Sequence, residues 1–143
     1  MSKGARGIDP YCQAVYTWED SWPGWGRNSI TLAACRRLIR TACARYKTLA
    51  PTVVKHEKES FSWSMPRIGR ISIRGGPHNG RGGLNVATAL HEAAHCIAWH
   101  LHGERIQDHG PTFLRIYLDL LVRARVAPEL ALKATARSFG LKC

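Results

Sequence analysis

The stretch HEAAHCIAWHLHGERIQDHGPTF, residues 91–113, holds five histidines, two glutamates and one aspartate. His91 and His95 are four residues apart, so on a helix their imidazoles lie on one face, about one turn apart, within reach of a single metal ion. Glu92 lies between them and completes the pattern HExxH, in which the glutamate takes a proton from the attacking water. The stretch therefore predicts a zinc site on a helix, with Glu92 as general base.

Apolar residues around the motif follow helical spacing, which favours a metal site over an ordinary polar helix. This apolar stripe consists of Leu84, Ala87, Leu90, Ala94, Ile97, Ala98 and Leu101. His91 and His95 fall on or beside it, so they turn toward the core, where imidazoles need partners. A shared metal ion is the simplest partner for both.

A catalytic zinc needs a third protein ligand and an open position. His102 shares the helical face of His95 but lies about 10 Å further along the helix, which is out of reach. His100 points to a different face. His109 follows the helix break expected at Gly103, so the chain can return it to the site from a loop. His109 is the predicted third ligand.

Two carboxylates in the same stretch offer alternatives for the third position. Glu104 and Asp108 are possible ligands, because carboxylates complete some HExxH sites. Asp108 is better placed to orient a ligand imidazole through a hydrogen bond. The HxxGxxH continuation typical of metzincins is absent, since His95 is followed by CIAWHLHG.

The segments before the motif predict an N-terminal leader and a basic helix. Residues 1–27 mix tyrosines and tryptophans with proline and glycine, which predicts an irregular leader that covers the core edge or occludes the site. From an N-cap at Ser29 to a stop at Pro51, one helix places apolar residues on one face and basic residues on another. The apolar face is Ile30, Ala34, Leu38 and Ala42, and the predicted phosphate-contacting residues are Arg36, Arg37, Arg40, Arg45 and Lys47.

Short strands and two further helices complete a single domain over residues 28–143. The runs TVVKHEK, FSWSM and RIGRISIRG predict three short antiparallel strands, and the glycine-rich residues 75–83 predict a loop. Pro111 opens a helix after the histidine stretch. A last helix begins at the proline of PELALKATARSFG and is closed by Gly140. The order predicts an α+β fold.

The composition bounds the partners and the compartment. With 21 Lys and Arg against 10 Asp and Glu, the formal charge of +11 favours DNA or another polyanion as a partner, although such a charge also keeps a small domain soluble. Five cysteines without a CxxC pair, and no signal peptide, predict a cytoplasmic protein. No apolar run approaches the roughly 20 residues that span a bilayer, so no membrane partner is expected.

HEAAH, a linker and then HGPTF resemble the SprT-like (Spartan-type) zinc metallopeptidases, whose pattern is HExxH followed by HGxxF. The order of a basic helix, three strands, the HExxH helix and a helix after HGxxF is similar over residues 28–125. The resemblance implies a minimal zincin-like metalloprotease domain, with zinc on His91, His95 and His109. It also implies that Glu92 is the general base and that Phe113 packs behind the site.

The family cleaves proteins crosslinked to DNA, and DNA activates its members. The leading hypothesis is therefore a zinc metallopeptidase that acts on DNA-associated proteins, whose substrate strand adds to the sheet edge. Tyr117, His78 and Arg81 are candidate oxyanion partners. The alternative is a basic nucleic-acid-binding or virion-associated protein in which zinc is only structural. The compact length also suits a phage or mobile-element protein.

Overall fold

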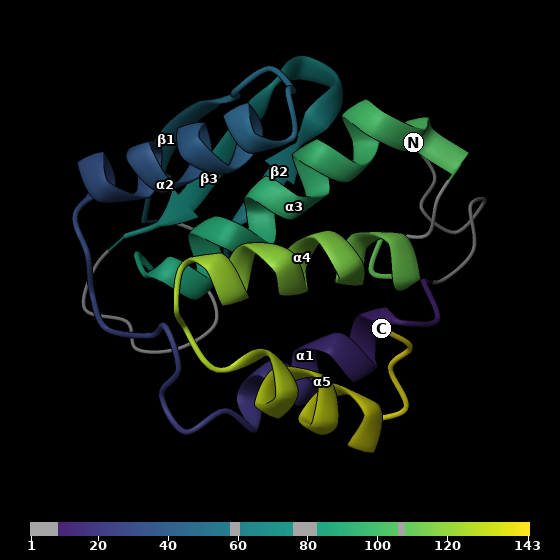
Figure 1. Cartoon of the computed structure of the whole chain (residues 1–143). Helices are drawn as coiled ribbons and strands as arrows, with labels where there is room; N and C mark the ends of the chain where they lie inside the picture. The colour runs from purple at the N-terminus through teal and green to yellow at the C-terminus, as the bar shows by residue number, and fades with distance from the viewer. Residues whose placement is uncertain (1–8, 58–60, 76–82, 106–107) are drawn as a thin grey trace.

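The computed structural model describes residues 9–57, 61–75, 83–105 and 108–143 (Figure 1). Within these ranges the chain forms five α-helices, two short 3-10 helices and one three-stranded sheet, which confirms the α+β class. The elements are α1 (Cys12–Asp20), α2 (Leu32–Arg45), β1 (Thr52–His56), β2 (Trp63–Met65), η2 (Pro66–Ile68), β3 (Arg70–Arg74), α3 (Val86–His102), η3 (Gly103–Arg105), α4 (Pro111–Arg123) and α5 (Glu129–Ser138).

The sheet is mixed, so the prediction of three antiparallel strands is wrong. The strand order is β1-β3-β2; β2 pairs antiparallel with β3, but β1 pairs parallel with β3. The 3-10 helix η2 and Gly69, with φ of 64°, reverse the chain between β2 and β3 and make that pair a hairpin. β1 pairs with the other edge of β3, so β1 and β2 are consecutive in sequence but are not neighbours in the sheet.

Helix α2 is shorter than the sequence predicted, and its buried face is rotated. Its N-cap is Thr31, whose hydroxyl accepts a hydrogen bond from the main-chain N–H of Ala34, rather than Ser29. The helix ends at Arg45, well before Pro51. Two residues after this end, Lys47 adopts a left-handed conformation with φ of 56°. The buried residues of α2 are Cys35, Ile39, Ala42 and Cys43.

Helix α3 is the central element, and it carries the HEAAH motif. Asn85 caps its start by accepting a hydrogen bond from the Thr88 N–H at 2.8 Å, and Gly103 ends it as predicted. The helix contacts α2, the strands β2 and β3, and α4. Figure 1 shows α3 between α2 with the sheet on one side and α4 on the other. This central place buries most of its residues, including His91 and Glu92.

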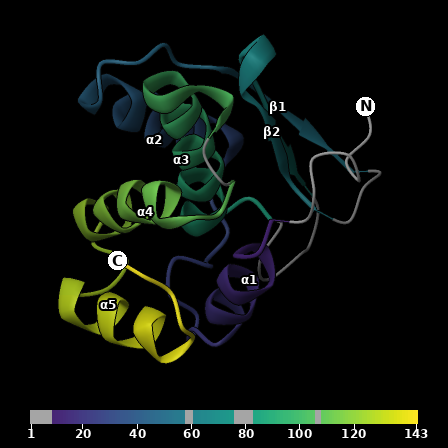
Figure 2. The same cartoon turned by 90° about the vertical axis from the view of Figure 1, so that its right-hand side faces the viewer.

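The N-terminal segment contains a buried helix, so the prediction of an irregular leader is wrong for Cys12–Asp20. Val15 and Trp18 of α1 are fully buried in the common core, and the Trp18 indole N–H donates to the Thr135 hydroxyl of α5 at 2.9 Å. Figure 2 shows α1 and α5 side by side, on the other side of α4 from α2. The segment is therefore an integral layer of the fold.

The last two helices begin at the prolines that the sequence predicted, and the second of them ends where it predicted. Pro111 occupies the first turn of α4, Pro128 is the N-cap of α5, and Gly140, with φ of 78°, follows the end of α5. None of the helices in the described part of the chain is both long enough and apolar enough to cross a membrane.

Candidate metal centre

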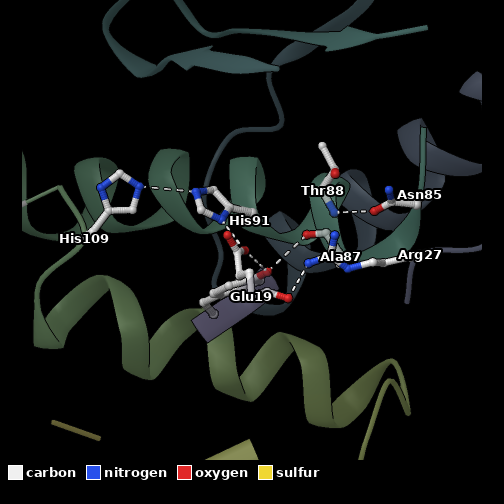
Figure 3. A network of polar contacts seen from close by, with 8 residues as sticks. Glu19, Arg27, Asn85, Ala87, Thr88, His91 and His109 are labelled. Atoms are coloured by element: carbon white, nitrogen blue, oxygen red, sulfur yellow. Dashed lines mark hydrogen bonds and ion pairs between the residues drawn. The ribbon is translucent and has the colours of Figure 1, made fainter. Parts of the chain in front are cut away.

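Three histidines from two parts of the chain converge at one point. His91 and His95 lie one turn apart on α3, and His109 lies in the turn before α4. One nitrogen from each ring falls within 4.8 Å of the other two, and His91 Nε2 is 3.3 Å from His109 Nε2. Figure 3 shows these two rings turned toward each other. Three imidazole nitrogens at this spacing could hold one metal ion.

Two carboxylates hold the opposite nitrogens of two of these rings. His91 Nδ1 lies 2.7 Å from Glu19 Oε2, and His109 Nδ1 lies 2.7 Å from Asp9 Oδ2. The same Asp9 oxygen accepts the main-chain N–H of His109 at 3.0 Å. An imidazole that donates from Nδ1 to a carboxylate keeps its Nε2 lone pair for a metal, and its ring orientation is fixed. Both carboxylates therefore prepare the histidines for metal binding.

Glu19 is itself held in place by a third group. Its side chain is 5% exposed, and the Tyr117 hydroxyl donates to Glu19 Oε2 at 2.5 Å. Burial disfavours the charged carboxylate, but the His91 charge and the hydrogen bonds from His91 and Tyr117 outweigh it, so the pKa of Glu19 is lowered. Glu19 is thus an ionised acceptor beneath His91.

The two other histidines of the cluster favour the neutral form. Desolvation by the surrounding side chains, followed by repulsion from neighbouring His91, lowers the pKa of His95 well below its ordinary value. Burial also lowers the pKa of His109, although Asp9 opposes the shift. Because a metal ion binds the neutral imidazole, this environment suits a metal site.

Glu92 lies beside the histidines, at the wall of a cavity. It is 7% exposed, and burial raises its pKa, with an opposing, smaller effect of a side-chain hydrogen bond with Ser64 of β2. The cavity has a volume of about 330 Å³, and both His91 and Glu92 line it. A carboxyl group with a raised pKa at the wall of a cavity is suited to exchange protons with a molecule bound there.

Aromatic rings enclose the cluster. Phe113 is fully buried and stacks on His95, with ring centroids 4.4 Å apart, which is the position that the resemblance implied. Tyr16 of α1 packs on the other side, with its ring centroid 5.2 Å from that of His109 and 5.9 Å from that of His91. These rings exclude solvent from the histidines and limit their rotation.

The alternative ligands lie away from the cluster. Asp108 is exposed. The sequence predicted that Asp108 orients a ligand imidazole, but the carboxylate that contacts His109 Nδ1 is that of Asp9. Glu104 is exposed and pairs with Arg67. The remaining histidines of α3, His100 and His102, are also exposed.

Of the three candidate oxyanion partners, only Tyr117 falls in the described part of the chain. Tyr117 is fully buried, and its hydroxyl donates to Glu19 and lies 3.4 Å from the Ala87 carbonyl oxygen. Its hydroxyl therefore supports the histidine cluster rather than facing a substrate. His78 and Arg81 lie outside the described residues.

The predicted phosphate-contacting residues fall into two groups. Arg36 donates to the Val53 carbonyl oxygen at 3.0 Å, and Arg45 pairs with Asp119 at 3.5 Å, so both have partners within the fold. The other three are exposed on or just after α2; they are Arg37, Arg40 and Lys47. These three remain the better candidates for a polyanion contact.

Glu19 and Asp9 were missed from sequence, although one signal pointed to Glu19. Val15, Trp18 and Trp22 follow helical spacing, and Glu19 falls on that same apolar stripe. A carboxylate on a buried stripe needs a buried partner. Asp9 precedes the helix and has no comparable pattern.

Replacing Glu19 with Gln is expected to weaken metal binding about 10- to 100-fold, because a neutral amide no longer fixes the His91 ring or raises its basicity. Zinc affinity measured by competition with a chromophoric chelator gives the comparison. Glu129→Gln, which changes an exposed carboxylate paired with Lys133 on α5, is the matched control and should bind as the wild type does. Equal affinities for Glu19→Gln and wild type would show that His91 needs no such support.

Comparison with models of protein families, with curated proteins and with solved structures found no match to this chain. The candidate site therefore stands on its own geometry.

Proposed function

We propose that this protein is a zinc-dependent metallopeptidase of the SprT-like kind. The observation that carries the proposal is the convergence of three imidazoles next to the buried carboxyl group of Glu92. Glu92 lies on α3, the helix that carries two of the three histidines. Imidazole ligands suit zinc, and three protein ligands leave a coordination position open for chemistry, whereas structural zinc sites usually close the fourth position.

Each residue of the site has a separate role in the proposed peptide hydrolysis. When bound, zinc supplies Lewis-acid polarisation of the scissile carbonyl and a lowered pKa for water. His91, His95 and His109 hold the ion. Glu92 takes the proton of the attacking water on its carboxylate and returns it to the leaving amine. Glu19 keeps His91 in the orientation and tautomer that this arrangement needs.

An edge strand next to Glu92 supports a peptide as substrate. β2 is at one end of the strand order, and Ser64 of β2 makes a side-chain hydrogen bond with Glu92. An extended substrate that pairs with this edge would place its backbone beside the base. The proposed substrates are therefore proteins with an accessible extended segment.

DNA-associated proteins are the proposed source of such segments, because the net charge of +11 and the exposed Arg37 and Arg40 on α2 attract a polyanion. The same basic surface supports the second candidate, a nucleic-acid-binding or virion-associated protein with a structural zinc ion. Salt-dependent DNA binding by zinc-loaded protein that cleaves no peptide would favour this second function.

Wild-type protein purified without added metal is expected to contain about one zinc ion per chain, and His109→Ala is expected to lose most of it, because two ligands from one helix bind a metal weakly. Elemental analysis of both proteins provides the measurement. The control is His102→Ala, whose exposed imidazole lies outside the cluster, and it should keep its zinc. Retention of zinc by His109→Ala at the wild-type level would contradict the ligand assignment.

A further inference from the structure

The cavity beside Glu92 has walls from four parts of the chain. α1 contributes Tyr16 and Glu19, the loop after it Trp22 and Arg27, and the start of α3 Thr88, while Phe61 and Ser62 precede β2. Because His91 and Glu92 also line it, whatever occupies this cavity lies next to the proposed reaction centre. Its volume of about 330 Å³ is at the small end of ligand pockets, the size for part of a peptide rather than a large cofactor.

Arg27 is a half-buried cation in this wall. Its guanidinium donates through Nη2 to the main-chain oxygen of Glu19, and its Cζ lies 6.0 Å from the centroid of the Trp22 ring. Among the described residues no carboxylate pairs with it, and its buried Nε has no hydrogen-bond partner. Removing a charge from water without an opposite charge is costly, so this position is suited to receive an anion.

A second donor in the same wall also lacks a partner. Trp22 is 6% exposed, and its buried indole Nε1 has no hydrogen-bond partner among the described residues. A tryptophan N–H can only donate, so it needs an acceptor. Two buried donor atoms, Arg27 Nε and Trp22 Nε1, therefore have no acceptor among the described residues, and both belong to side chains that line one cavity.

Glu19 does not cancel this positive character. Its Oε1 has no hydrogen-bond partner among the residues that the structure describes, but the carboxylate accepts hydrogen bonds from both His91 and Tyr117 through Oε2. Its negative charge is therefore directed to the histidine cluster. Arg27 is the one Lys or Arg side chain among the described residues that line the cavity, and no described carboxylate lies within ion-pair distance of its guanidinium.

We propose that this cavity binds a carboxylate of the substrate, through the Arg27 guanidinium and the Trp22 indole N–H. A carboxylate supplies acceptors for both donors and the charge that Arg27 lacks, and the aromatic side chains of Tyr16, Trp22 and Phe61 suit its apolar stem. The carboxylate comes from an acidic side chain or from a chain terminus. Calling the ligand a substrate rests on the proposed peptidase function, but the binding chemistry does not.

The test uses small probes and the indole N–H resonance of Trp22, identified by its loss in Trp22→Phe. The probes are the α-amide of N-acetylglutamate, the amide of N-acetylglutamine, and N-acetylalanine, which carries only a terminal carboxylate. We expect a saturable shift of the Trp22 resonance with at least one carboxylate probe. The glutamine probe should bind at least about tenfold more weakly than the glutamate probe, since hydrogen bonds to charged groups are the stronger ones. The better carboxylate probe tells which source the cavity accepts.

Variants then test the two donors. Arg27→Gln should weaken the carboxylate probe about tenfold or more, while Arg137→Gln, an exposed arginine at the end of α5, should not. Trp22→Phe, read from the ligand's own resonances, should weaken it less, and Trp99→Phe is the matched control on α3. Thermal melts check that each variant is folded. If Arg27→Gln does not fold, Trp22→Phe still tests the proposal.

Equal binding of the glutamine and glutamate probes, no saturable shift with either carboxylate, or unchanged affinity in folded Arg27→Gln would each overturn the proposal. These measurements need no peptide cleavage. If carboxylates bind through Arg27 but zinc-loaded protein hydrolyses no peptide, the proposed peptidase function fails while the carboxylate site stands. If peptides are cleaved with no preference for an acidic group and the probes do not bind, the carboxylate site fails while the proposed peptidase function stands.

Discussion

Glu92→Gln is expected to lower kcat for peptide hydrolysis by about 10²- to 10⁴-fold, which is the usual contribution of a general acid–base group. The amide has the shape of the carboxyl group but cannot take up the proton of the attacking water. It is expected to leave the zinc content unchanged, because Glu92 is placed beside the histidines and not among the three converging ligands. Steady-state kinetics and elemental analysis on the same preparation measure both effects.

The buried position of Glu92 makes this substitution mild for the fold. Burial disfavours the charged carboxylate and raises the pKa of Glu92, so an uncharged amide of the same shape adds no desolvation cost, and it can still accept a hydrogen bond from Ser64. Glu104→Gln, a change in an exposed carboxylate paired with Arg67, is the matched control and should retain the wild-type rate. Wild-type hydrolysis by zinc-loaded Glu92→Gln would remove Glu92 from the mechanism and leave the structural-zinc alternative as the stronger one.

The local part of the candidate site could be predicted from sequence, and the distant part could not. The spacing of His91 and His95 follows from helical periodicity, and the break at Gly103 allowed the chain to return His109. Glu19 and Asp9 contact histidines that lie 72 and 100 residues further along the chain. Such contacts depend on how α1 packs, which no spacing within a single helix reveals.

The fold divides in the same way. Gly103, Pro111 and Gly140 mark helix ends through their own backbone preferences, so those boundaries were predictable. Strand direction was not, because successive side chains point to opposite faces of a strand whether its neighbour runs parallel or antiparallel. Helix α1 was also missed, since Pro23 and the glycines of residues 21–26 suggested irregular structure for the whole aromatic segment.

The helix α1 has a structural role that a removable leader would not have. Val15 and Trp18 are fully buried, and Trp18 packs edge-on against Trp22 with ring centroids 4.8 Å apart. Trp18 also reaches Tyr117, with centroids 6.1 Å apart, and Tyr117 in turn holds Glu19. Loss of this packing therefore affects both the core and the support of the histidine cluster.

Trp18→Ala is expected to lower the free energy of unfolding by about 3–5 kcal/mol, because it leaves a large cavity and removes the hydrogen bond that the Trp18 indole donates to Thr135. That is a large part of the roughly 5–15 kcal/mol of a typical domain, so removal of residues 1–27, which takes Val15, Trp18 and Trp22 together, should abolish cooperative unfolding. Urea titrations followed by circular dichroism measure both. Trp99→Ala, a half-buried tryptophan on α3, is the control and should cost much less. A truncated chain with the wild-type midpoint would show that the first 27 residues are a dispensable cover after all.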